Sequence, residues 1–172
     1  MSAITFIFNP AKALEAILYA SRLAPIPDIY HVLKILYFAD KAHLEQYGRF
    51  IFGDSYVAMP KGPAPSGAYD IINYVRGKST VIPFEPAKSA FSVFDYSIKT
   101  LREPNLELLS KSDIKCIEAA AAKYGNFAFD QLHSASCDRA YKNADKNDFM
   151  SVESIASTLE DGDLIIEHLN AQ

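Results

Sequence analysis

The chain has 172 residues, of which 49% are hydrophobic and 22% are charged, and its net charge is −4; such a chain suits one globular domain with a buried core. It has no apolar run long enough to span a membrane, its start lacks the features of a signal peptide, and two cysteines are too few for a secreted disulfide framework. We therefore expect a single cytoplasmic domain over residues 1–172 with no membrane partner.

The first predicted helix begins at Asn9-Pro10, where a capping side chain is followed by a proline at the first helical position. Pro25 and Pro27 end it, because proline removes a backbone donor and clashes with the preceding turn. Apolar and small side chains recur on one face of this helix, which predicts that the face is buried. They are Leu14, Ile17, Leu18 and Ser21.

The second predicted helix begins near Asp28 and ends at Gly48, a residue that adopts the left-handed conformation common after helices. At about 100° per residue, apolar side chains cover most of its circumference, so we expect it to be the central helix, packed on several sides. A narrow stripe of polar side chains is expected to face solvent. It consists of Tyr30, Lys34, Lys41 and Glu45.

Asp40 and His43 fall inside the apolar arc of this central helix. A buried carboxylate without partners would cost several kcal/mol, so Asp40 must be hydrogen-bonded, and His43 lies three residues away on the same face. An Asp–His pair also occurs in catalytic sites, where the carboxylate orients the imidazole. The sequence has no nucleophile elbow, HExxH, Walker loop or GxGxxG motif. A structural polar network is the favoured interpretation, and a catalytic or ligand-binding pair remains the alternative.

The following stretch, FGDSYVAMPKGPAPSGAYD, is rich in proline. Residues 56–59 read as a short extended run, and residues 60–65 read as a stiff, extended path into a helix over residues 66–76. One interpretation is a rigid connector that fixes the angle between two helices. The other is a preorganised binding surface that carries Tyr56, Met59 and Lys61, which would lose little entropy on binding.

The third quarter of the chain combines short apolar runs with one well-marked helix. Residues 80–100 hold Val81-Ile82 and two further runs among prolines and polar residues, which predicts a small antiparallel hairpin or sheet. Ser110 and Asp113 have the spacing of a capping box, so a helix is expected from there to Gly125. Together these elements predict a mainly α (α+β) fold: a compact multi-helix domain around the central apolar helix.

Further helices are predicted over residues 127–141, 151–159 and 163–170. His133 and Cys137 are four residues apart and could share a metal ion, but two cysteines and four histidines in the whole chain do not favour a complete zinc site. We therefore predict no metal and no other cofactor.

Residues 145–172 form an acidic helical end, in which seven acidic residues face one lysine for a net charge of −6. This segment is interpreted either as a pair of solvated helices or as a docking surface for a basic partner, with Glu160, Asp161 and Asp163 as its contacts. The first 144 residues carry a net charge of +2 without a basic cluster. A nucleic-acid partner is therefore not expected.

Residues 33–70, LKILYFADKAHLEQYGRFIFGDSYVAMPKGPAPSGAYD, resemble the signature of the Panacea, or SocA-like, antitoxin domain family. The shared pattern is a KLLYFAD-x-x-HL helix, then YGR, a GDxYVAM stretch and a GPxPS turn. A weaker resemblance extends from about residue 10 to about residue 160. Pro60 and Tyr141 depart from the pattern, which has a basic or aromatic residue and a tryptophan at these positions.

The resemblance implies binding rather than catalysis. Members of this family resemble antitoxins of bacterial and phage toxin–antitoxin systems, which neutralise a toxin encoded by an adjacent gene, and a protease or chaperone is a further expected partner. Two alternatives stay open: a hydrolase-like enzyme using Asp40, His43 and His133, and an autoregulatory DNA-binding protein. The predicted partner-binding residues are Tyr56, Met59, Lys61, Pro63, Pro65, Glu160, Asp161 and Asp163. The predicted structural polar network consists of Asp40, His43, Arg49, Asp54 and His133.

Overall fold

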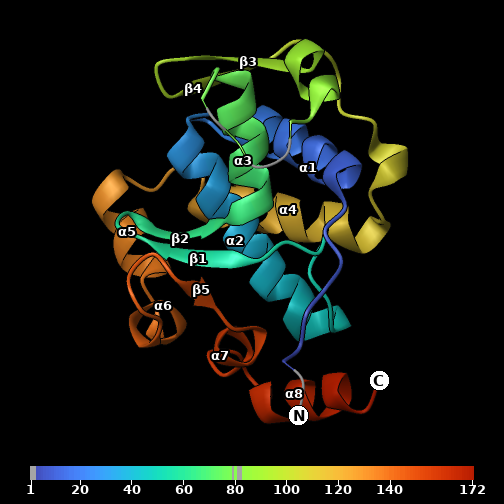
Figure 1. The fold of residues 1–172 in the computed structure, drawn as a ribbon, viewed down its shortest axis with the longest axis vertical. Coiled ribbons are helices and arrows are strands. Elements are labelled where there is room, and N and C mark those ends of the chain that lie inside the picture. The colour runs from blue at the N-terminus through green and yellow to red at the C-terminus, as the bar shows by residue number, and fades with distance from the viewer. Residues whose placement is uncertain (1–2, 79, 81–82) are drawn as a thin grey trace.

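The computed structural model describes residues 3–78, 80 and 83–172, and these residues form eight α-helices, two short 3-10 helices and two small antiparallel sheets (Figure 1). The predicted mainly α (α+β) class is confirmed. None of the described helices is both long and apolar enough to cross a membrane. In chain order the elements are α1 (Pro10–Leu23), α2 (Ile29–Tyr47), β1 (Tyr56–Met59), β2 (Gly62–Pro65), α3 (Ser66–Val75), η1 (Glu85–Ser89), β3 (Phe91–Phe94), β4 (Ser97–Thr100), η2 (Leu106–Leu108), α4 (Lys111–Tyr124), α5 (Phe129–Ser136), α6 (Arg139–Asn143), β5 (Phe149–Met150), α7 (Val152–Ala156) and α8 (Gly162–Asn170).

The first helix, α1, begins as its sequence predicts. The Asn9 side chain accepts a hydrogen bond from the Lys12 N–H at 3.1 Å, and Pro10 occupies the first helical position. The helix ends at Leu23, two residues before Pro25. All four residues of the predicted stripe are buried, which confirms the face assigned from the sequence.

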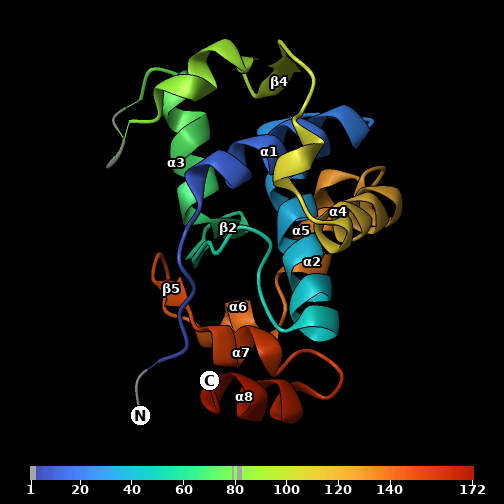
Figure 2. The same ribbon diagram turned by 90° about the vertical axis from the view of Figure 1, so that its right-hand side faces the viewer.

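The second helix, α2, is the central element and passes between α1, α4 and the β1–β2 strands (Figures 1 and 2). Its N-cap is Asp28, which accepts from the His31 N–H at 2.7 Å, and its C-cap is Gly48 with φ +75°. Thirteen of its 19 residues are buried, so the predicted central position is confirmed. The predicted solvent exposure of Lys34 is wrong: this residue is 2% exposed, because strand β2 covers it.

The proline-rich stretch folds back on itself instead of running on as an extended connector. Strand β1 pairs with β2 in antiparallel register, Tyr56 opposite Pro65 and Met59 opposite Gly62. The prolines are tolerated because β2 is an edge strand of the sheet β2–β1–β5. Gly62 has φ +110°, and a Cβ there would lie 3.1 Å from the Lys34 Nζ, so both the turn and the buried lysine favour glycine.

The third strand of this sheet, β5, comes from the acidic end of the chain and pairs with β1. It has only two residues, too few to show an alternating pattern, and was not predicted. The hairpin predicted near residues 80–100 is confirmed as β3 and β4, with Phe91 opposite Thr100. Val81 and Ile82, which the prediction included, lie outside the described residues.

The second half of the fold agrees with the sequence except at one break. In the capping box of α4, Asp113 accepts from the Ser110 N–H at 2.8 Å and Ser110 accepts from the Asp113 N–H at 3.1 Å. The single helix predicted over residues 127–141 is wrong. It is divided into α5 and α6, because the Asp138 side chain accepts from the Tyr141 N–H at 3.1 Å and starts a new helix. Helix α7 lies within the predicted segment 151–159, and α8 begins one residue before the predicted segment 163–170.

Candidate functional site

The carboxylate of Asp40 is sealed in the core and joins α2 to the segment that follows it. Asp40 is 0% exposed. One oxygen accepts from the Ile51 N–H at 2.7 Å, and the other accepts from the Tyr56 hydroxyl at 2.6 Å. Burial raises the pKa of Asp40 to about 7, against the opposing effect of these two hydrogen bonds. Asp40 thus fixes both the loop after α2 and the first residue of β1.

The imidazole of His43 is equally buried but has different partners. Its Nδ1 lies 2.8 Å from the Arg49 carbonyl, and its Nε2 lies 2.8 Å from the Ser112 Oγ and 3.2 Å from the Asp113 Oδ1. Asp113 is also paired with Lys12 at 2.7 Å. Although burial opposes its ionisation, hydrogen bonds from His43 and Lys12 hold the pKa of Asp113 well below its usual range. His43 therefore ties α2 to the start of α4.

Two more of the predicted network residues lie on the same loop. Arg49 donates to the Phe50 carbonyl at 3.1 Å and the Ile51 carbonyl at 3.2 Å. Asp54 accepts from the Gly67 and Ala68 N–H groups at 2.7 and 2.8 Å, and so caps α3 from outside the helix. Burial raises the pKa of Asp54 to about 6. These side chains satisfy backbone groups that would otherwise be buried without partners.

The structure does not assemble the residues of the hydrolase alternative around a cavity. Asp40 and His43 are each 0% exposed. His133 lies on α5, where its Nδ1 is 3.2 Å from the Cys137 Sγ. None of the three lines the pocket beside the β1–β2 turn or the second pocket, beside residues 49–53. The arrangement therefore favours the structural interpretation of Asp40 and His43.

The residues predicted to bind a partner divide into buried and accessible ones. Tyr56, Pro63 and Pro65 lie inside the domain, and the Tyr56 hydroxyl is already bonded to Asp40. Their burial contradicts the prediction that these three residues contact a partner directly. Met59 is half-buried and Lys61 is exposed at the β1–β2 turn. The three acidic residues of the other predicted surface, Glu160, Asp161 and Asp163, are exposed at the start of α8.

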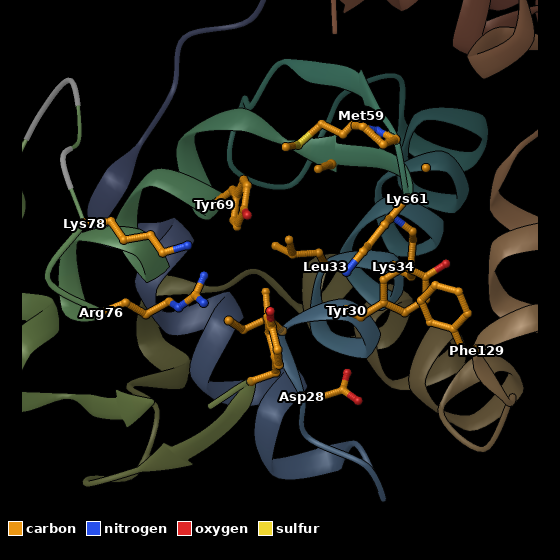
Figure 3. Close-up of a pocket in the computed structure, with 15 residues that line it drawn as sticks. Asp28, Tyr30, Leu33, Lys34, Met59, Lys61, Tyr69, Arg76, Lys78 and Phe129 are labelled. Carbon is orange, nitrogen blue, oxygen red and sulfur yellow. The ribbon is translucent and has the colours of Figure 1, made fainter. Parts of the chain in front are cut away.

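A pocket of about 470 Å³ opens beside the β1–β2 turn, and no pattern in the sequence predicts it (Figure 3). Its walls come from α2, the β1–β2 turn, α3 and single residues of the β3–β4 turn and α5. Because these segments are far apart in the chain, their spacing carried no signal. The charged and aromatic lining residues are Asp28, Tyr30, Lys34, Lys61, Tyr69, Arg76, Lys78, Tyr96 and Phe129.

No group of three or more His, Cys, Asp or Glu residues that could hold a metal ion occurs within the described ranges.

The family model described as "Antitoxin SocA-like, Panacea domain" matches residues 32–140, which is 109 of the 172 residues. The matched segment contains most of α2 and every element from β1 to α5. No curated protein and no solved structure matches the chain.

Proposed function

The chain belongs to the SocA-like, Panacea-domain antitoxin family, and on that premise we propose that it neutralises a cognate toxin by direct protein–protein binding. The toxin is the product of an adjacent gene in a bacterial or phage genome, and both proteins act in the cytoplasm. The family match is the observation that carries this proposal. It covers most of the central helix and several of the elements packed on it, among them β2, α4 and α5, so it includes a large part of the core of the fold.

The role of the buried polar residues supports binding over catalysis. Asp40 and His43 make their hydrogen bonds to the loop at residues 49–51, to β1 and to α4, all within a sealed core. A general acid or base must reach a substrate, directly or through one water molecule. Asp40 and His43 are fully enclosed and already hydrogen-bonded, so we assign them to fixing the positions of these segments and not to reacting with a substrate.

We place the first toxin contact at the β1–β2 turn, with Met59 and Lys61. The Tyr141 hydroxyl donates to the Met59 carbonyl at 2.6 Å, and Gly62 pairs with Met59 across the two strands. A turn fixed in this way loses little conformational entropy when a partner binds. Methionine is also among the residue types enriched in interfaces.

We place the second contact at the acidic start of α8, with Glu160, Asp161 and Asp163. These side chains are exposed, so they attract a basic partner at long range more than they strengthen the bound state. Raising the salt concentration is therefore expected to slow association with the toxin and to change the dissociation rate little.

The test is co-expression of this chain with the product of each adjacent gene, scored by bacterial growth and by co-purification. The contact variants are Met59→Ala/Lys61→Ala and Glu160→Gln/Asp161→Asn/Asp163→Asn. Asparagine is chosen at Asp161 because this residue has φ +58°, a conformation that asparagine tolerates. We expect wild type to restore growth and each contact variant to bind the toxin at least about tenfold more weakly.

The matched control is Lys111→Ala/Lys115→Ala, which removes two exposed lysines from α4. It should restore growth as wild type does. Full rescue and wild-type affinity in both contact variants would show that the toxin binds elsewhere. If no adjacent gene product is toxic or binds the chain, the antitoxin proposal itself fails.

A further inference from the structure

The pocket beside the β1–β2 turn concentrates positive charge in a protein whose net charge is −4. Four of its lining residues are cationic: Lys34, Lys61, Arg76 and Lys78. None of them lies within 4.0 Å of a carboxylate oxygen in the part of the chain that the structure describes. Elsewhere Lys12, Lys41 and Arg102 each have a carboxylate at 2.7–2.8 Å.

The single acidic residue of the lining, Asp28, is already engaged. Its side-chain oxygen accepts from the His31 N–H at 2.7 Å and lies 2.9 Å from the His31 Nδ1. It serves as the N-cap of α2 and does not pair with the pocket cations. The charge of Lys61, Arg76 and Lys78, and that of Lys34 when it is protonated, is therefore open to an anion that enters the pocket.

Lys34 lies deepest among these cations. It is 2% exposed, and its ammonium group donates to the Pro63 carbonyl at 2.7 Å and lies 4.8 Å from the centre of the Tyr30 ring. Burial lowers the pKa of Lys34 to about 7. A buried ammonium group with a single hydrogen-bond acceptor is costly, and an anion in the pocket would offset part of that cost.

Aromatic rings make up much of the remaining lining. Tyr30 and Phe129 are stacked with their centres 4.4 Å apart. The Tyr96 ring has Lys61 at 5.7 Å and Arg76 at 5.4 Å from its centre. Figure 3 shows Arg76 and Lys78 directed toward the middle of the pocket, with Tyr69 above them. The pocket thus combines flat apolar surfaces with positive charge.

We propose that this pocket binds a nucleoside phosphate. The cations at Lys61, Arg76 and Lys78 bind the phosphate oxygens, and the base packs against the tyrosine and phenylalanine rings, since any base stacks on an aromatic face. A volume of about 470 Å³ lies in the range of small-molecule sites. An extended nucleic-acid strand fits less well, because it needs a basic track beyond one pocket, and the chain as a whole is acidic.

This proposal does not rest on the antitoxin function, because the ligand is measured with the purified chain alone. Isothermal titration calorimetry with AMP, ADP, GMP and GDP should show binding to one site per chain. Adenosine, guanosine and inorganic phosphate, which each carry only half of the ligand, should bind at least about tenfold more weakly than the best nucleotide.

Two charge-matched variants locate the site. Lys61→Ala/Lys78→Ala removes two exposed lysines from the pocket, and Lys111→Ala/Lys115→Ala removes two exposed lysines from α4. Circular dichroism first establishes that both are folded. The pocket variant should bind the best nucleotide at least about tenfold more weakly, whereas the α4 variant should bind it as wild type does.

Three results would overturn the proposal. The first is the absence of nucleotide binding to wild type at millimolar concentration. The second is an equal loss of affinity in both double variants, which would mean attraction to net charge only. The third is a phosphate ion or a single-stranded oligonucleotide that binds the wild-type chain more tightly than every mononucleotide.

Discussion

Replacement of Asp40 by alanine should destabilise this protein more than most single substitutions. The change removes a carboxylate that is 0% exposed and accepts two hydrogen bonds inside the core. The Ile51 N–H and the Tyr56 hydroxyl would lose this acceptor. The Leu36 carbonyl, 3.2 Å from the Tyr56 hydroxyl, is a weaker substitute for one of them.

The magnitude follows from the groups left behind. A buried donor without a partner costs about 1–3 kcal/mol, and Asp40→Ala leaves two such donors, the Ile51 N–H and the Tyr56 hydroxyl. The cost of burying the carboxylate itself, which raises the pKa of Asp40 to about 7, is relieved in the variant and offsets part of the loss. We expect Asp40→Ala to lower the free energy of unfolding by about 3–4 kcal/mol.

The assay is urea unfolding followed by circular dichroism, with Tyr56→Phe and the double variant completing a thermodynamic cycle. Tyr56→Phe removes only the hydroxyl that bonds Asp40 and should cost about 1–3 kcal/mol. Because the two side chains share one hydrogen bond, the losses should not add. A loss below about 1 kcal/mol in Asp40→Ala, or additive losses in the cycle, would refute the structural role.

Three further outcomes are expected. Burial raises the pKa of Asp40 from 3.8 to about 7 and that of Asp54 from 3.8 to about 6. The folded state therefore holds protons that the unfolded chain releases, and the contribution of these two residues to stability falls as the pH rises from about 4 to about 7. The free energy of urea unfolding should fall less steeply with pH in Asp40→Asn than in wild type, and equal slopes would contradict this. Burial lowers the pKa of Lys34 from 10.5 to about 7, so at about pH 6 the folded state holds a buried charge, whereas at about pH 9 the folded lysine is neutral. Lys34→Met should therefore stabilise the fold more at about pH 6 than at about pH 9, and a thermal midpoint lowered at both pH values would contradict this. Because His133 and Cys137 offer one pair of ligands, elemental analysis should find no stoichiometric zinc and a chelator should leave the thermal midpoint unchanged; one tightly bound transition metal per chain would contradict this.

The elements that the sequence predicted are those whose signals lie within a few residues of each other. The caps at Asn9 and Asp28, the capping box of α4 and the glycine after α2 all form in the structure as expected. The burial of Asp40 also followed from helical periodicity, because a central helix places a residue by its angle around the axis. Local hydrogen bonds and periodicity determine these features, so one sequence is enough to predict them.

The partners of those residues were decided by the tertiary structure. Tyr56 was predicted to lie on a surface, but it lies in the core, where its hydroxyl extends from β1 to the Asp40 carboxylate on α2. Lys34 was assigned to the solvated stripe, but the return of β2 buries it against the Pro63 carbonyl. Lys34 and Pro63 are 29 residues apart in the chain, so no short-range pattern in the sequence predicts their contact.

The pocket depends on tertiary structure most strongly. Its cations come from α2, the β1–β2 turn and the segment directly after α3, and Tyr96 and Phe129 close it from two later segments. Each residue alone reads as an ordinary polar or aromatic side chain in the sequence. The sequence by itself determined the helices, their caps and the buried face of α2, because those depend on neighbours along the chain. Only the packing of α2 against β2, α3 and α5 brings four cations to one cavity, because charges that far apart in sequence meet only when the chain has folded.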